Sequence, residues 1–220
     1  MFTKWRLLLD LWKYEQGKPG NADMAVQVIY HFNGKSKQNQ MRVWAATPTG
    51  KRYLAGERIL DDIESFRERD PNTLGAKYLE FRDKYRFGEV RDELPSMQDK
   101  YPDELEAAYG LFMQDAHDFT HVITGYPPDT LGELMRIKVY KKYEGRGWAI
   151  VDYMGWLWYH TKLIKEVKKY KELTREAQET SRFVKNYILE DWFKLLGTHI
   201  NKVRQNLSTN SSILHNWERT

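Results

Sequence analysis

The sequence predicts an all-α protein, a single-domain multi-helix bundle that extends over residues 1–220. Three observations favour this fold class. Apolar residues recur at spacings of three and four along most of the chain, which is the period of a helix with one buried face. Proline, glycine and capping residues punctuate these segments at lengths typical of helices. No alternating apolar and polar set is long enough to predict a sheet, although residues 41–45 are compatible with an extended segment.

Four helices are expected in the first half of the chain, over residues 2–14, 22–32, 57–69 and 73–85. The sequence Thr-Pro-Thr-Gly at 47–50 is expected to form a turn, because proline and glycine interrupt regular structure. Thr73 stands at the N-cap position of the fourth helix, where its hydroxyl can accept a backbone hydrogen bond. Three aromatic residues share one face of that helix, which indicates a buried side: Tyr78, Phe81 and Tyr85.

Four longer helices are expected in the second half, over residues 103–124, 130–143, 148–170 and 174–205. Pro102 fits the start of the first of these helices, and Asp103 favours its positive end. Gly125 is a natural helix stop, and the following Pro127-Pro128 pair prevents the helix from resuming at once. Residues 206–220 are expected to form a loose tail.

The composition excludes several classes of protein. The chain has 220 residues, enough to bury a core without cross-links, and its lack of cysteine excludes disulfide scaffolds and thiolate metal sites. The net charge of +4 is mild and the basic residues lack the layout of a known module, so no nucleic-acid partner is expected. No segment approaches the roughly 20 apolar residues of a membrane-spanning helix, and no signal peptide is evident. A cytoplasmic location is therefore expected.

Basic and aromatic residues are concentrated together in the region 138–171. Basic charge beside tryptophan and tyrosine is typical of a surface that binds the membrane interface. The same pattern also arises when a solvated helix is followed by a core helix. Both interpretations stay open, and they concern one aromatic cluster in particular: Trp156, Trp158 and Tyr159.

Two histidines one helical turn apart give the strongest chemical signal in the sequence. His117 and His121 fall on the predicted helix 103–124, so they lie on one face, and two imidazole nitrogens can reach the same metal ion. Asp118 follows the first histidine directly. Its carboxylate can be a ligand, a partner that orients a histidine, or a base that acts on bound water.

A second carboxylate is expected to complete this site. The chain must turn after Gly125, and the next helix begins near Asp129 or Thr130, which places Glu133 in its first turn. A helix hairpin of this kind can return Glu133 to the histidines. The resulting nitrogen and oxygen donors suit zinc, iron, manganese or cobalt better than copper(I).

Other interpretations of the same residues stay open. Thr130 and Glu133 have the spacing of a capping box, and histidines on a helix can be core residues with satisfied hydrogen bonds. A metal-dependent phosphohydrolase of the His-Asp type needs further ligands, for which His31 and Asp152 are the candidates. A zinc peptidase is disfavoured, because Asp118 stands where its glutamate base belongs.

The motif His-Asp-x-x-His, followed by eleven residues and Glu, resembles the signature of a ubiquinone (coenzyme Q) biosynthesis family, whose yeast member is the product of the fourth coenzyme Q gene. Further segments resemble this family in matching order and spacing: 48–58, 70–81, 104–118, 132–141 and, more weakly, 188–194. The resemblance covers about residues 48–205. Ile59 departs from it, since the family usually has proline there. The absence of a mitochondrial presequence favours a bacterial member or a processed form.

The resemblance implies two candidate roles in quinone biosynthesis. One is a metal-dependent enzyme that replaces the C1 carboxylate of a polyprenylated ring intermediate by hydroxyl, an oxidative decarboxylation. The other is a non-catalytic scaffold that holds the prenyl lipid and organises the biosynthetic enzymes. The metal-site residues carried over from the family are His117, Asp118, His121 and Glu133, with Asp118 as the candidate catalytic residue. The implied cofactor is a divalent metal ion, with zinc expected and iron, manganese or cobalt as alternatives.

The resemblance also implies a location and partners. Family members dimerise and associate with membranes and with other quinone-biosynthesis enzymes. A homodimer bound peripherally to the inner face of the bacterial membrane is therefore expected, whereas eukaryotic relatives occupy the matrix side of the mitochondrial inner membrane. Trp156, Trp158 and Tyr159 are candidate contacts of the prenyl tail, and the alternative is that these aromatic residues fill the core.

Overall fold

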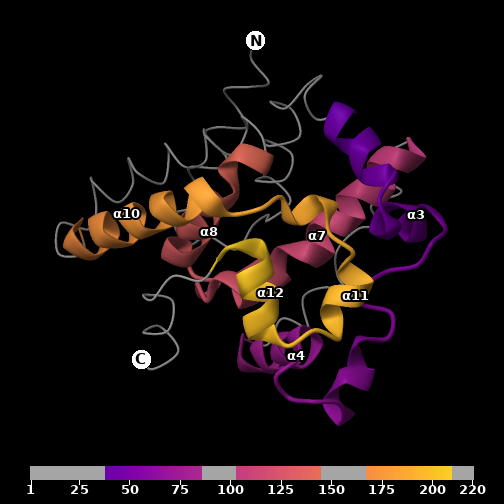
Figure 1. Cartoon of the computed structure of the whole chain (residues 1–220), viewed down its shortest axis with the longest axis horizontal. Coiled ribbons are helices and arrows are strands. Elements are labelled where there is room, and N and C mark those ends of the chain that lie inside the picture. The colour runs from indigo at the N-terminus through magenta and orange to yellow at the C-terminus, as the bar shows by residue number, and fades with distance from the viewer. Residues whose placement is uncertain (1–37, 86–102, 145–166, 210–220) are drawn as a thin grey trace, which may run out of the picture. The chain divides into compact units, whose positions relative to one another are not determined.

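The computed structural model describes residues 38–85, 103–144 and 167–209, and the regular elements within these ranges are all helices (Figure 1). This confirms the all-α class. The expected helices 2–14 and 22–32 and most of 148–170 lie outside the described residues. None of the described helices has the length and apolar character needed to cross a membrane.

Contacts divide the chain into two compact units. The first contains residues 39–128 and 183–220, and the second contains residues 1–38 and 129–182. In the first unit the described helices are a segment at 38–45 (whose first residue belongs to the second unit), α3 (Pro48–Leu54), η1 (Ile63–Glu68), α4 (Leu74–Tyr85), α7 (Glu104–Thr124), η3 (Tyr187–Leu189), α11 (Trp192–Leu196) and α12 (Ile200–Leu207). The second unit contributes α8 (Thr130–Glu144) and α10 (Val167–Phe183), the last residue of which belongs to the first unit.

Helix α7 is the centre of the first unit, because it packs against α3, α4 and α12 (Figure 1). Aromatic rings contribute to these contacts: the Phe119 ring stacks on Tyr78 of α4 at 4.1 Å between centroids, and the Phe112 ring stacks on Trp44 at 5.3 Å between centroids. Helices α4 and α12 meet through an antiparallel bridge between Thr73 and His199. The expected central position of the motif-bearing helix is therefore found in this unit.

The segment 41–50 differs from the expectation. Residues 41–45 are helical, so the extended segment suggested by the sequence is wrong. The Thr-Pro-Thr-Gly sequence begins helix α3, because the Thr47 side chain accepts a hydrogen bond from the Gly50 amide and Pro48 occupies the first turn. Proline fits this position because the first helical amides have no intrahelical acceptor.

The expected helix 57–69 is replaced by turns and the short 3-10 helix η1. Two aspartates explain the difference, since carboxylates that bond to nearby groups compete with helix formation. Asp61 accepts a hydrogen bond from the Arg58 amide at 2.8 Å, and the Asp62 side chain accepts one from the Ser65 hydroxyl at 3.0 Å. The expected cap of α4 is confirmed, because the Thr73 hydroxyl accepts a hydrogen bond from the Ala76 amide.

The C-terminal region also differs. The sequence predicts one helix over 174–205, whereas the structure has the end of α10 followed by η3, α11 and α12. Asn186 and Asp191 each begin a new element, because their side chains accept the amides of Ile188 and Lys194. Both residue types are strong N-caps, and they favour new helix starts over one continuous helix.

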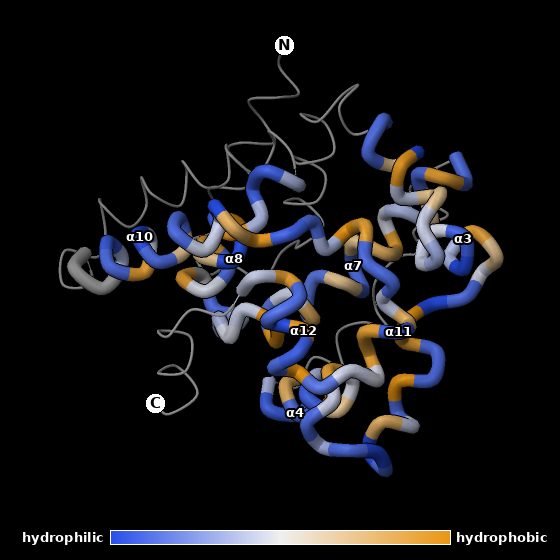
Figure 2. Tube along the Cα trace, viewed as in Figure 1, coloured by the Kyte–Doolittle hydropathy of each residue, from blue (hydrophilic) through white to orange (hydrophobic). Residues whose placement is uncertain are grey.

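The two helices of the second unit have contrasting surfaces. Residues 134–140 of α8 are buried all round the helix, including the charged side chains of Arg136 and Lys138. Helix α10 is mostly hydrophilic (Figure 2), and its charged residues Lys171, Glu172 and Arg175 are exposed. The ammonium group of Lys138 lies 5.7 Å from the ring centre of Tyr170 on α10.

Gly50 tests the packing at the start of α3. A Cβ atom at this position would lie 2.2 Å from the Trp44 carbonyl oxygen, so the backbone would have to shift. We expect Gly50→Ala to lower the free energy of unfolding by roughly 2 kcal/mol or more, measured by chemical denaturation. Gly197→Ala is the matched control, since its Cβ would meet nothing within 4 Å, and it should be neutral or slightly stabilising. Equal stabilities for the two variants would contradict this packing.

Candidate metal site

Helix α7 carries three of the expected site residues: His117, Asp118 and His121. The helix begins at Asp103, whose side chain accepts a hydrogen bond from the Glu106 amide at 2.9 Å. Tyr109 and Phe112, in its first half, are buried in the aromatic core. The motif His117–His121 lies in its last two turns. His121 is almost fully buried, with 1% of its surface exposed, whereas His117 and Asp118 are partly exposed.

The end of α7 fixes the orientation of His121. Gly125 adopts a left-handed conformation with φ 75°, and its amide donates to the His121 carbonyl at 2.7 Å. The chain then turns so that the Tyr126 carbonyl oxygen lies 3.0 Å from His121 Nδ1. A carbonyl only accepts hydrogen bonds, so Nδ1 must be the donor. In the neutral ring, the lone pair that can bind a metal is consequently on Nε2.

His117 is oriented by its neighbour. Its Nδ1 lies 2.9 Å from Asp118 Oδ1, so the Nδ1–H group donates a hydrogen bond to the carboxylate, and the lone pair of the neutral ring is on Nε2. Metal-binding histidines typically have this arrangement, in which the second ring nitrogen bonds to a carboxylate or a carbonyl. Of the three roles expected for Asp118, this hydrogen bond corresponds to the orienting one.

Glu133 lies in the first turn of α8. The N-cap of this helix is Asp129, whose side chain accepts the Gly132 amide at 2.7 Å. The N-cap position thus belongs to Asp129, one residue before the Thr130 that a capping box with Glu133 would place there. The Glu133 carboxylate lies 3.3 Å from Nε of the buried Arg136.

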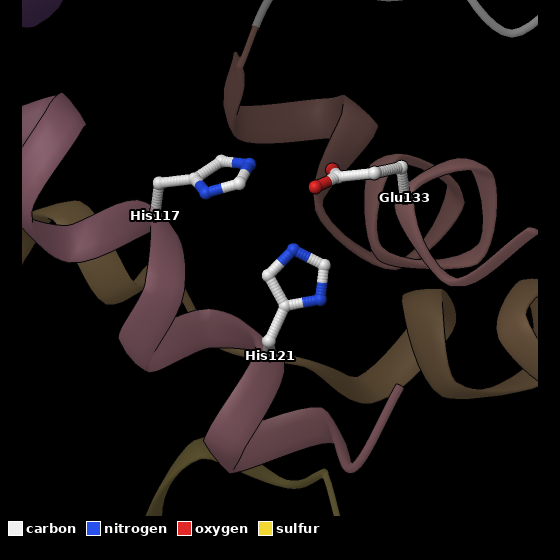
Figure 3. Close-up of side chains that lie close together, drawn as sticks. All are labelled: His117, His121 and Glu133. Atoms are coloured by element: carbon white, nitrogen blue, oxygen red, sulfur yellow. The ribbon is translucent and has the colours of Figure 1, made fainter. Parts of the chain in front are cut away.

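Potential ligand atoms of His117, His121 and Glu133 all lie within 4.8 Å of one another. Figure 3 shows the Nε2 atom of each imidazole, the ring nitrogen farther from the backbone, pointing toward the Glu133 carboxylate. Ligands about 2.0–2.2 Å from one ion lie roughly 3–4 Å apart, so small side-chain rotations would suffice to close the group around a metal. The donor set of two neutral imidazoles and one carboxylate fits zinc and other divalent ions.

A second buried group, which was not predicted from the sequence, anchors α7 just before the motif. Asp115 is fully buried and accepts two hydrogen bonds from Arg58, at 2.7 and 3.0 Å, and one from the Tyr53 hydroxyl at 2.8 Å. Burial of the phenol and the adjacent Asp115 carboxylate raise the pKa of Tyr53 above its ordinary value. The hydrogen bond to Asp115 raises the pKa of Arg58. The only available signal was Asp115 within the apolar part of a predicted helix.

Several expected site residues lie outside the described residues. They include the candidate lipid contacts Trp156, Trp158 and Tyr159. His31 and Asp152, which the phosphohydrolase alternative requires, also lie outside. These expectations stay predictions.

The sequence matches the model of a known family over residues 18–212. Its description is coenzyme Q (ubiquinone) biosynthesis protein Coq4. The matched region includes all four residues of the motif.

Individual relatives are similar over a shorter stretch. Two proteins named ubiquinone biosynthesis protein COQ4, mitochondrial, from strains G186AR and NAm1 of Ajellomyces capsulatus, are 34% identical to the chain over 97 residues. This stretch is 42% of the chain and 34% of each relative, so the chain spans about a third of the length of the fungal proteins. The fold is similar to the crystal structure of a candidate ubiquinone biosynthesis protein from Nostoc punctiforme, with a TM-score of 0.70 and 14% identity, over 94% of this chain and 97% of the other.

The buried Tyr53 hydroxyl predicts a loss of stability in alkali. The folded protein holds Tyr53 protonated above its ordinary pKa of 10.0, while the unfolded chain releases the proton, so rising pH favours unfolding. Relative to Tyr53→Phe, the free energy of unfolding of the wild type should fall by about 1.4 kcal/mol for each pH unit above about 10. Urea denaturation across this range measures the difference, and parallel curves for the two proteins would contradict the assignment.

Proposed function

The chain belongs to the coenzyme Q (ubiquinone) biosynthesis protein family Coq4, and we propose that it serves ubiquinone biosynthesis by binding a polyprenylated ring intermediate at a divalent metal ion. His117, His121 and Glu133 would hold the ion. The observation that carries this proposal is the convergence of their potential ligand atoms within 4.8 Å, with both imidazoles oriented through Nδ1. Zinc is the expected ion, with iron, manganese and cobalt as alternatives.

The bound ion would supply a Lewis acid and a template for the substrate's ring carboxylate and adjacent phenol oxygen. The reaction that fits such binding replaces the carboxylate by hydroxyl and releases carbon dioxide. This change is a two-electron oxidation. With dioxygen as the proposed external oxidant and water as the source of the hydroxyl oxygen, the ring carboxylic acid, water and dioxygen would give the phenol, carbon dioxide and hydrogen peroxide. The chain's own residues hold the two imidazoles and the carboxylate in place, which leaves the remaining coordination positions to substrate oxygens.

Asp118 has an orienting role in this proposal. Its carboxylate accepts a hydrogen bond from His117 Nδ1–H, and that bond favours the tautomer in which Nε2 can coordinate the metal ion. The negative charge of Asp118 also makes the imidazole a better donor to a cation. Arg136 is proposed to act similarly on Glu133, since its Nε lies 3.3 Å from the carboxylate and can hold that carboxylate in one orientation.

The proposed substrate has a long apolar tail, so the protein is proposed to work at a membrane surface, as a homodimer with other enzymes of quinone synthesis. The prenyl tail is proposed to contact Trp156, Trp158 and Tyr159. A non-catalytic scaffold for the same lipid is the alternative, and the metal distinguishes the two, because only the enzyme requires it.

Loss of one histidine should abolish metal binding. We expect the untagged wild type to bind close to one equivalent of zinc or another divalent ion by elemental mass spectrometry, and His121→Ala to bind none. His199→Asn is the control, because His199 caps the start of α12 and an asparagine side chain can accept the same hydrogen bond from the Asn201 amide. A wild type that stays metal-free after incubation with zinc, iron, manganese and cobalt would contradict the metal-dependent enzyme and favour the non-catalytic scaffold.

Replacement of Asp118 should weaken metal binding without abolishing it. Asp118→Asn keeps an oxygen that can accept the His117 proton but removes the charge, so the dissociation constant should rise about 10–100-fold, as for other groups that orient metal ligands. Competition with a chromophoric chelator measures the constant. A loss as complete as that of His121→Ala would identify Asp118 as a direct ligand instead.

A further inference from the structure

Arg204 of α12 is a buried cation that reaches the motif-bearing helix from far along the chain. Only 7% of its surface is exposed. Its Nε donates to the Ile123 carbonyl and its Nη2 donates to the Val122 carbonyl, each at 3.1 Å. Val122 and Ile123 directly follow His121 in the last turn of α7. The two residues that the guanidinium contacts are 82 and 81 positions away in the sequence.

The last turn of a helix needs partners of this kind. Its final carbonyl groups have no intrahelical amide to accept from, and they form the negative end of the helix dipole. The fork of a guanidinium can donate to two carbonyls at once and adds a positive charge there. Arg204 thereby complements the Gly125 amide, which donates a hydrogen bond to the carbonyl of His121 itself.

Helix α12 is itself firmly placed. The Ile200 amide donates to the Asn72 carbonyl at 2.8 Å, and the Leu74 amide donates to the Thr198 carbonyl at 2.9 Å. At the other end, the Thr209 amide donates to the carbonyl of Arg204 at 2.9 Å. The guanidinium therefore projects from a helix that is bonded to the start of α4, and it can impose a position on the turn it contacts.

We propose that Arg204 is a positioning residue for the metal site, which acts through the last turn of α7 to keep His121 hydrogen-bonded to the Tyr126 carbonyl. The connection is short. Arg204 fixes the carbonyls of Val122 and Ile123, and the Tyr126 carbonyl that sets the His121 ring follows three residues after Ile123. Without the guanidinium, this turn loses two hydrogen bonds and a charge, and the Tyr126 oxygen loses its fixed place. The expected effect on zinc affinity rests on the metal site proposed above, whereas the expected effect on the His121 ring can be tested without a metal.

The first measurement uses the metal-free protein. Two-bond proton–nitrogen correlation spectra, at a pH where imidazoles are neutral, report which ring nitrogen of His121 carries the proton. The wild type should show a proton on Nδ1, and Arg204→Met, which keeps a side chain of similar length, should show averaging between the two tautomers. The same variant should bind zinc roughly tenfold more weakly, the lower end of the effect of groups that orient ligands. Arg204→Lys should be intermediate, since an ammonium keeps the charge but lacks the fork.

Gly50→Ala is the control for a purely structural effect. Its Cβ would lie 2.2 Å from the Trp44 carbonyl oxygen at the start of α3, so it should lower stability without changing the His121 tautomer or the zinc affinity. A folded Arg204→Met, or Arg204→Lys if the first variant does not fold, with the wild-type tautomer would overturn the proposal. A changed tautomer in a protein whose wild type binds no zinc would instead uphold the positioning role and reject the metal site.

Discussion

The point at which α7 ends governs what its histidines can do. The helix stops at Gly125, four residues after His121. The left-handed conformation of this glycine reverses the chain, so that the Tyr126 carbonyl accepts a hydrogen bond from His121 Nδ1. A residue with a Cβ atom would disfavour this conformation. If the helix continued by even one residue, the Tyr126 carbonyl would point along the helix axis and His121 would lose its partner. The proposed metal chemistry therefore begins with a backbone turn, before any ligand is considered.

Two arginines hold the same stretch of helix from opposite ends. Arg58 pairs with the buried Asp115 before the motif, and Arg204 takes the carbonyls after it. A buried carboxylate without such a partner would be strongly destabilising, and helix carbonyls without donors would have to remain near water. The segment from Asp115 to Ile123, which presents the histidines, is thus fixed by long-range contacts as well as by its own hydrogen bonds. This rigidity suits a site whose ligands must converge within a fraction of an ångström.

The local parts of this arrangement were predictable from the sequence, and the long-range parts were not. The spacing of His117 and His121, the glycine stop and the return of the chain at Asp129 follow from helical geometry and capping preferences, which act over a few residues. Arg58 and Arg204 were missed because their partners are distant in the sequence, and an arginine in a polar pattern gives no sign of the distant group to which it will donate. The expected helices 57–69 and 174–205 were wrong for a related reason: Asp61, Asp62, Asn186 and Asp191 form local side-chain bonds that outweigh helical periodicity.

X-ray absorption at the zinc edge tests the proposed arrangement of donors around the ion most directly. For the zinc-loaded wild type, we expect two imidazole nitrogens at about 2.0–2.1 Å, with multiple-scattering features from both rings, and the remaining scatterers as oxygen. His117→Ala should remove one imidazole from the fit. A spectrum with no imidazole scattering, or one that is unchanged in that variant, would show that the histidines of α7 do not hold the metal.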